Sequence, residues 1–352
     1  MLGAASSPEV APKEDTMQNP TMRGVLGAAA TATAMALVMG WSFDAQAQKV
    51  LRLGHDQVTA HTYQHTSEFF AERVKELSNG ELEVQIFPGA TLGTETSMLQ
   101  EVISGNLDMS LSTTANASSF VPAFGMLSVS YLFSDGEHFK RALLDPEFNA
   151  ALDALIEAQD PGFIRVASIT PGARSVYNIF GPVEALDDIE GKKMRVMASP
   201  VESKVWGQLG TLPVAIPFGD VYTGMQTGLV EAAENSPGSY VLNKHYEVAP
   251  YFSLTEHQWP VSLIFMGETT WEGLSEAERE VILEAGRDTA AFGVDNATSG
   301  DNALLDEMAS KYGVKVNRLD TAPFVEQLAA LQDETAAELG TEELLARIRE
   351  LR

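Results

Sequence analysis

Apolar and polar residues alternate along residues 81–87, whereas residues 62–78 repeat apolar side chains such as Phe70 and Val74 at the spacing of a helical turn. The first period is typical of a half-buried strand, and the second is typical of an amphipathic helix. The two patterns follow each other through the first half of the chain. They predict further strands at residues 49–54, 107–112, 162–168 and 174–180, and a helix at residues 94–104.

A second group of alternating segments covers the rest of the chain. Strands are predicted at residues 193–197, 212–216, 229–234 and 314–316, with helices at residues 200–209, 219–227 and 324–352. Residues 251–266 are predicted to form two strands that return to the first group. Ser275 is predicted to cap a helical region that runs with breaks to residue 311, because Glu278 stands three positions later as in a capping box.

The alternation of strands and helices places the protein in the α/β class. Two α/β lobes with several crossings between them favour a clamshell that closes on a ligand at the lobe interface. We expect mixed sheets and long C-terminal helices. The expected division assigns residues 48–171 and 262–320 to lobe 1, residues 172–261 to lobe 2, and residues 321–352 to helices that pack across both lobes.

The first 47 residues are expected to be an upstream extension and a signal peptide. The biological start is open among Met1, Met17 and Met22. After Met22 come one arginine, an almost wholly small or apolar run at residues 24–41, and the small-x-small sequence at residues 45–47. This order is typical of a cleaved secretory signal, although the run is also long enough for a membrane anchor.

Composition narrows the possible partners and chemistries. The formal charge of −26 opposes binding to nucleic acid or to anionic lipid, so neither is expected as a partner. The chain has no cysteine, which excludes thiol catalysis and cysteine-ligated metal sites. It also contains no Gly-x-Ser-x-Gly elbow, no phosphate-binding loop and no dinucleotide fingerprint. No enzyme activity and no cofactor are therefore expected.

Three residues in the predicted second lobe suggest a pocket for a small organic acid. Arg195 lies near the end of a predicted strand, Phe218 follows, and Asn235 comes 40 positions after Arg195 (235 − 195). A guanidinium matches a carboxylate in two parallel hydrogen bonds. The Asn amide adds a donor and an acceptor, and the Phe ring supplies an apolar wall.

Short motifs in a fixed order carry a resemblance to a known family. They are Phe87-Pro88, Leu92-Gly93-x-Glu95, Gly105-Asn106-Leu107-Asp108-Met109, Ala233-Glu234-Asn235 and His245-Tyr246-Glu247-Val248. With the order of Arg195, Phe218 and Asn235, this series closely resembles the solute-binding subunit of TRAP transporters, the DctP-like family. The resemblance implies a monomeric periplasmic-binding-protein clamshell in the periplasm. It also implies delivery of a small organic acid to a small and a large membrane subunit.

The resemblance assigns roles to individual residues. Arg195 would pair with the ligand carboxylate, Asn235 would hold it, and Phe218 would cover the carbon skeleton. Arg174 would either bind the acid or brace the hinge. The first lobe would read hydroxyls or a second polar end through Glu95, Thr113, Asn116 and His61. Many family members have charged groups at the positions of Thr113 and Asn116, where this chain has neutral ones. This difference favours a simpler acid or a sugar acid over sialic-acid-like ligands. Residues 233–240 resemble the version found in uronate-type sugar acid binders, so a sugar acid such as a uronate is expected first, with C4-dicarboxylates and hydroxy or keto acids as alternatives.

A different class of function rests on histidines near the N-terminal end of the mature chain. His61 and His65 stand four positions apart and could present two nitrogens to zinc. Only His55 or Asp56 is nearby as a third ligand, and no Glu follows in a zinc-protease pattern. A secreted metal-binding protein or hydrolase is thus the alternative hypothesis, and no bound metal is expected.

Overall fold

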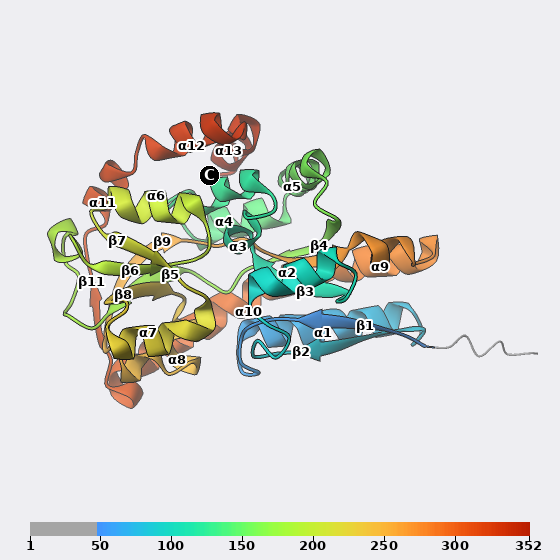
Figure 1. Cartoon of the computed structure of the whole chain (residues 1–352), viewed down its shortest axis with the longest axis horizontal. Helices are drawn as coiled ribbons and strands as arrows, with labels where there is room; N and C mark the ends of the chain where they lie inside the picture. The colour runs from blue at the N-terminus through green and yellow to red at the C-terminus, as the bar shows by residue number, and fades with distance from the viewer. Residues whose placement is uncertain (1–47) are drawn as a thin grey trace, which may run out of the picture. The chain divides into compact units, whose positions relative to one another are not determined.

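The computed structural model describes residues 48–352, and for residues 298–302 it describes the backbone alone. The first lobe is built on a five-stranded sheet of order β2-β1-β3-β10-β4 (Figure 1). β1 pairs in parallel with β2 and β3, while β10 runs antiparallel to β3 and β4. The bounds are β1 Lys49–Gly54, β2 Leu82–Phe87, β3 Met109–Thr113, β4 Phe163–Ile169 and β10 Ser262–Gly267.

The second lobe is built on a six-stranded sheet of order β11-β9-β5-β8-β6-β7. β5 lies antiparallel between β9 and β8, whereas β8, β6 and β7 run parallel to one another. Both sheets are therefore mixed, as the sequence predicts. The bounds are β5 Arg174–Asn178, β6 Lys193–Val196, β7 Leu212–Ala215, β8 Ala232–Asn235, β9 Tyr251–Gln258 and β11 Lys315–Arg318.

Helices flank both sheets. In the first lobe they are α1 Thr62–Leu77, α2 Glu95–Ile103, α3 Thr114–Ala117, α4 Gly136–Leu144, α5 Pro146–Gln159, α9 Glu268–Glu272 and the 3-10 helix η1 Pro122–Ser128. In the second lobe they are α6 Pro200–Gln208, α7 Val221–Thr227, α8 Pro237–Leu242 and the 3-10 helices η2 Leu186–Asp188, η3 Phe218–Asp220 and η4 His245–Glu247.

The long helix α10, Glu276–Tyr312, joins the two lobes. Its first half packs on α1 and β4, and it reaches α8 and β11 of the second lobe. Its contact with β4 is close at Gly286, where a Cβ would lie 2.1 Å from the backbone oxygen of Val166. The capping box of Ser275 and Glu278 is confirmed. The breaks expected within this helix are not found, because one unbroken helix runs from residue 276 to residue 312.

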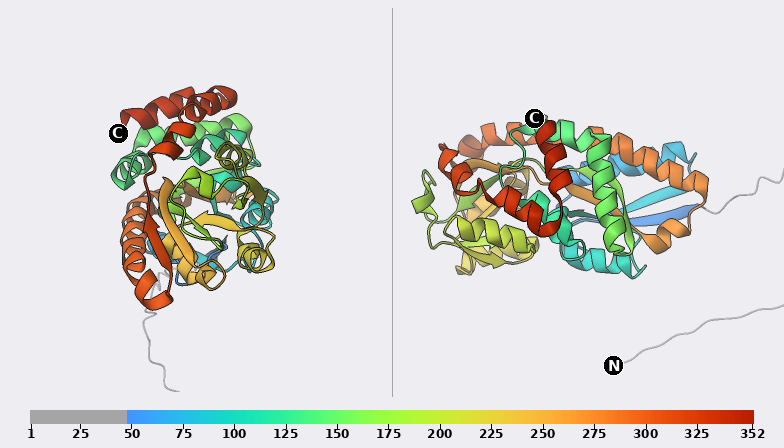
Figure 2. Two further views of the ribbon diagram at one scale, coloured as in Figure 1. Left: turned by 90° about the vertical axis from the view of Figure 1, so that its left-hand side faces the viewer. Right: turned by 90° about the horizontal axis from the view of Figure 1, so that it is seen from above.

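The C-terminal part of the chain contacts both lobes. α11 Ala322–Gln327, α12 Leu331–Leu339 and α13 Glu342–Glu350 form a row, and α13 lies beside α5 (Figure 2). Arg347 forms an ion pair with Asp145 of the first lobe, and Glu338 forms one with Lys204 of the second. These contacts tie the last helices across the lobes.

The expected lobe division is wrong at one element. β11 pairs in parallel with β9, so it belongs to the second sheet, although residues up to 320 were assigned to lobe 1. The reason is α10, which carries the chain from one lobe to the other before β11 begins. Residues 136–159, to which the sequence analysis assigned no element, form α4 and α5. The expected signal peptide lies outside the described residues.

The crossings between lobes meet beside β5 and β9. The chain passes to the second lobe between β4 and β5 and returns between β9 and β10. The pairing of β5 with β9 shifts register between Arg174 and Val176, and Glu256 in β9 has a positive φ of 41°. Such a bulge bends a strand and re-aims its side chains.

Among the described residues, no helix is both long and apolar enough to span a bilayer.

Candidate ligand-binding site

Strand ends from both sheets meet at a small cavity between the lobes. Its volume is about 20 Å³, and a neighbouring hollow of about 350 Å³ shares four of its lining residues. The first-lobe wall consists of Asp56, Gln57, Tyr63, Glu95, Thr113 and Asn116, and the second-lobe wall consists of Arg174, Arg195, Met197, Phe218, Asn235 and Ser239. Pro171 at the first crossing completes the lining. Seven of the eight residues predicted from the sequence therefore lie around one cavity.

Arg195 projects from β6 and is 3% exposed. Its Nε donates to the backbone oxygen of Ile216 at 3.1 Å. Among the described residues, no carboxylate lies within ion-pair distance of this guanidinium. Burial lowers the pKa of Arg195, but a guanidinium stays protonated at physiological pH. A buried cation without a partner is costly, so the site is arranged to receive an anion.

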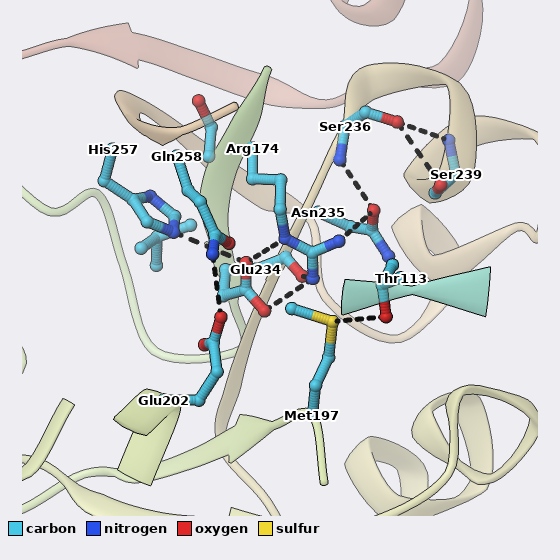
Figure 3. A network of polar contacts seen from close by, with 12 residues as sticks. Thr113, Arg174, Met197, Glu202, Glu234, Asn235, Ser236, Ser239, His257 and Gln258 are labelled. Atoms are coloured by element: carbon cyan, nitrogen blue, oxygen red, sulfur yellow. Dashed lines mark hydrogen bonds and ion pairs between the residues drawn. The ribbon is translucent and has the colours of Figure 1, made fainter. Parts of the chain in front are cut away.

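Arg174 begins β5, and its guanidinium donates to acceptors within the protein (Figure 3). It forms a two-pronged ion pair with Glu234, in which Nη2 lies 2.6 Å from Oε1, and Nη2 also donates to the Glu234 backbone oxygen at 2.7 Å. Nη1 donates to Oδ1 of Asn235 at 3.0 Å. Of the two roles considered for Arg174, the geometry favours bracing over binding the acid.

The contacts of Asn235 fix the orientation of its amide. Oδ1 accepts hydrogen bonds from Arg174 and, at 2.9 Å, from the backbone N–H of Ser236. Nδ2 has no partner among the described residues, and the side chain lines the cavity. Asn235 therefore offers a donor beside the Arg195 guanidinium, which is the polarity that a carboxylate needs.

Phe218 starts the 3-10 helix that follows β7 and is half-buried. The Arg195 guanidinium carbon lies 6.0 Å from the centre of its ring. The ring of His245 lies 5.4 Å away, centre to centre. Phe218 thus forms an apolar wall of the cavity next to the cation.

Glu95 is a buried carboxylate of the first-lobe wall, with 5% of its surface exposed, and protein hydrogen bonds fix its position. Its Oε2 accepts hydrogen bonds from Ser112 Oγ at 2.9 Å, from Thr113 N at 3.0 Å and Thr113 Oγ1 at 2.9 Å, and from Asn116 Nδ2 at 2.7 Å. Oε1 has no partner within the described part of the chain. Thr113 and Asn116 therefore orient Glu95, and its Oε1 keeps its full capacity to accept a hydrogen bond from outside the described residues.

Asp56 and Gln57 line the cavity directly after β1, and the sequence analysis did not name either as a ligand contact. Gln57 Nε2 donates to Asp56 Oδ1 at 3.0 Å. Burial and the neighbouring charge of Glu95 raise the pKa of Asp56 to about 8. The place of Asp56 and Gln57 just after the predicted strand at residues 49–54 could have marked them as candidate ligand contacts, because the carboxyl ends of strands in α/β sheets line ligand crevices.

His61 is placed elsewhere, so its predicted contact with the ligand is not supported. It caps α1, where Nδ1 accepts from the backbone N–H of Tyr63 at 3.1 Å, and Nε2 lies 3.0 Å from Ser239 Oγ. Both ring nitrogens are therefore occupied, and His61 does not line the cavity. No group of three or more residues able to hold a metal ion occurs in the described region, with His65 included in the search.

Several hydrogen bonds cross from one lobe to the other around the cavity. Asn116 Oδ1 accepts from the backbone N–H of Ala198 at 3.0 Å, and Asn243 Nδ2 donates to Gln57 Oε1 at 3.3 Å. These bonds form only when the lobes are close together. The structure therefore has the closed arrangement of a clamshell.

A buried polar network surrounds Glu234 (Figure 3). His257 Nδ1 pairs with Thr255 Oγ1 at 2.9 Å, and its Nε2 lies 3.3 Å from Glu234 Oε2. Gln258 Nε2 donates to Glu202 Oε1 at 2.9 Å. Burial and the charge of Glu234 raise the pKa of Glu202 to about 7. Gln258 of the bulged strand β9 thus contacts a buried carboxyl of α6 that titrates near neutral pH.

Comparison with known proteins places this geometry in a family. Residues 53–339 match the family described as bacterial extracellular solute-binding protein, family 7, or DctP. The chain belongs to the DctP family. A solute-binding protein of Sulfitobacter sp. (strain NAS-14.1) is 30% identical to this DctP protein over 331 residues, which are 94% of this chain and 98% of the relative.

Other DctP relatives have named ligands. The 2,3-diketo-L-gulonate-binding periplasmic protein YiaO of Escherichia coli is 26% identical over 288 residues, or 82% of this chain and 87% of YiaO. A TRAP periplasmic solute-binding protein from Sulfitobacter, solved with β-D-galacturonate, has a TM-score of 0.79 and 27% identity and covers 86% of this chain and 100% of its own. The sugar acid binding protein DctPAm from Advenella mimigardefordensis, solved with galactonate, has a TM-score of 0.81 and 27% identity, with coverages of 86% and 99%. The predicted family and two-lobed α/β fold are confirmed.

Proposed function

We propose that this DctP-family protein is the extracytoplasmic solute-binding subunit of a TRAP transporter and that it captures a small sugar acid, with a uronate in first place. The observation that carries the proposal is Arg195, a buried cation with no carboxylate partner among the described residues, beside groups suited to hydroxyls. The galacturonate and galactonate bound to similar proteins support the same ligand class.

Each wall of the cavity has a separate task in this proposal. The ligand carboxylate pairs with Arg195 and accepts a hydrogen bond from Asn235 Nδ2. Phe218 packs on the carbon skeleton, and Glu95 Oε1 accepts from a hydroxyl. Arg174 holds Asn235 and the hinge strands in place. Closure removes water from the ion pair, which strengthens its electrostatic attraction.

The lobes have to separate for a ligand to enter. A cavity of about 20 Å³ has room for roughly one water molecule, far less than a six-carbon acid. The hollow of about 350 Å³ beside it is also lined by residues of both lobes, so separation of the lobes would widen both spaces. A ligand that contacts both walls favours the closed form through those contacts.

The rest of the proposal follows the family. The protein acts as a binder without enzyme activity or cofactor, as a monomer in the periplasm after export by an N-terminal signal. The closed form delivers the acid to the small and large membrane subunits. C4-dicarboxylates and hydroxy or keto acids are the alternative ligands within the family. The metal-protein alternative is disfavoured because both nitrogens of His61 are already hydrogen-bonded.

Titration calorimetry on the purified mature chain tests the proposal. D-Galacturonate, D-glucuronate and D-galactonate should bind. In thermal unfolding, a ligand at 100 times its Kd should raise the free energy of unfolding by about 2.7 kcal/mol. Arg195→Ala should weaken binding by about 150- to 5,000-fold, the effect of removing one member of a buried charge pair. Arg287→Ala is the matched control, because the Arg287 side chain is 62% exposed and lies outside the cavity. Unchanged affinity in the Arg195 variant would refute the proposal.

A further inference from the structure

The two walls of the cavity differ in charge. Asp56 and Glu95 stand on the first-lobe wall, which contributes no Lys or Arg to the lining. On the second-lobe wall, Arg174 forms an ion pair with Glu234, whereas Arg195 forms no ion pair with any carboxylate of the lining. A bound ligand therefore faces a cation at one end and the carboxyl groups of Asp56 and Glu95 at the other.

The first-lobe wall suits hydroxyls and opposes a second acid group. We propose that Asp56 and Glu95 reject ligands with two carboxylates, so that this site takes sugar monoacids and excludes aldarates and C4-dicarboxylates. This inference rests on the proposed function and narrows its ligand class. It also assigns a specificity role to Asp56.

The contacts of Glu95 show what this wall accepts. Four donor bonds converge on Oε2, whereas Oε1 has no partner among the described residues and belongs to a side chain that lines the cavity. A ligand hydroxyl can donate to Oε1. A ligand carboxylate has no proton to donate and meets a buried acceptor instead.

The state of Asp56 shows that the wall is already at its limit of negative charge. Burial and Glu95 together raise the pKa of Asp56 to about 8, so this wall does not hold two full charges at neutral pH. The attraction of Arg195 lowers this pKa but does not offset the other two effects. A ligand carboxylate at the same place would meet the same burial and the same repulsion from Glu95.

Galactonate and galactarate form a matched pair of ligands for the test. They share a six-carbon chain and one carboxylate, and they differ at C6, where galactarate has a second carboxylate in place of a hydroxymethyl group. Like-charge contacts in a buried interface cost several kcal/mol, so the wild-type protein should bind galactarate about 100-fold or more weakly than galactonate. Calorimetry at pH 9 and low salt, where Asp56 with its pKa of about 8 is mostly ionised, measures both Kd values.

Two variants test whether the wall causes this selectivity. Asp56→Asn/Glu95→Gln should reduce the galactonate-to-galactarate ratio of affinities at least tenfold, and Asp56→Asn alone should reduce it in part. The single variant keeps the Glu95 hydrogen bonds, so it remains informative if the double variant unfolds. Glu280→Gln/Asp333→Asn is the charge-matched control, since these side chains are 65% and 66% exposed. That control should leave the ratio unchanged.

The outcomes separate this inference from the proposed function. Equal binding of galactonate and galactarate by the wild-type protein keeps the proposed function and overturns the inference. A ratio that stays constant in both wall variants overturns it as well. Absence of binding for every uronate and aldonate refutes the proposed function itself, and the inference with it.

Discussion

Replacing Arg174 by Met tests whether this arginine braces the second lobe instead of binding the ligand. Methionine keeps much of the side-chain volume and removes the charge. The change leaves Glu234, which is 0% exposed, without its ion-pair partner. It also removes one of the two donors that hold Asn235 Oδ1. If Arg174 is a brace, stability should fall sharply in the absence of any ligand.

The size of the effect follows from the burial of the pair. Breaking a buried ion pair on one side costs about 3–5 kcal/mol. The pKa of Glu234 gives a second measure. Burial raises it, but the charge and hydrogen bonds of Arg174 prevail and hold it at about 2. The difference from an ordinary value near 4.5 corresponds to about 3 kcal/mol, which is present above pH 4.5 and is lost as pH falls toward 2.

Scanning calorimetry at pH 7 measures the change directly. For a chain of this size, Arg174→Met should lower the Tm by about 6–10 °C. Arg174→Met/Glu234→Gln should recover at least half of that loss, because no unpaired charge remains buried. The double variant should also bind galacturonate at least tenfold more tightly than Arg195→Ala does.

Two results would refute this reasoning. A Tm loss below about 2 °C in Arg174→Met would mean that the pair contributes little to stability. A double variant as unstable as the single one would mean that the unpaired charge of Glu234 is not the cause of the instability. A double variant as weak in binding as Arg195→Ala would mean that the Arg174 guanidinium itself holds the ligand.

Three further changes test other parts of the structure. Glu202→Gln should raise stability by about 3 kcal/mol at pH 8 and by much less at pH 4.5, because ionising this buried carboxyl costs free energy as pH rises from 4.5 through about 7; urea unfolding at the two pH values checks this. Gly286→Ala should cost about 1–3 kcal/mol by forcing α10 away from β4, whereas Gly207→Ala, with open space around its Cβ, should be neutral or stabilising in the same thermal assay. Asn116→Ala removes a bond between the lobes and a donor to the ligand-facing carboxylate, and it should weaken galacturonate binding about tenfold in calorimetry, mainly through faster dissociation.

Local patterns in the sequence were sufficient for most elements. β1 and the helix after it were predicted nearly to the residue, since strand and helix periods are properties of neighbouring positions. The Ser275 capping box is also local and was predicted correctly. The partner sheet of β11 was not, because α10 carries the chain from one lobe to the other and the sequence does not show where a helix of 37 residues ends in space.

The site residues also separate into those that the sequence predicts and those that only the structure reveals. Residue type suggests Arg195, Phe218 and Asn235 for a carboxylate, and the resemblance of their order to the DctP-like family singles them out. Their ligand roles remain predictions, although the structure gathers them at one cavity.

The sequence by itself determined the α/β class, the family and the cation expected to receive the acid. Only the tertiary structure decided which polar groups remain free to meet a ligand. Arg174 and His61 are occupied by protein partners, while Asp56 joins Glu95 on the opposite wall. The physical reason is that a side chain's availability depends on its partners in space, and here those partners come from distant parts of the chain.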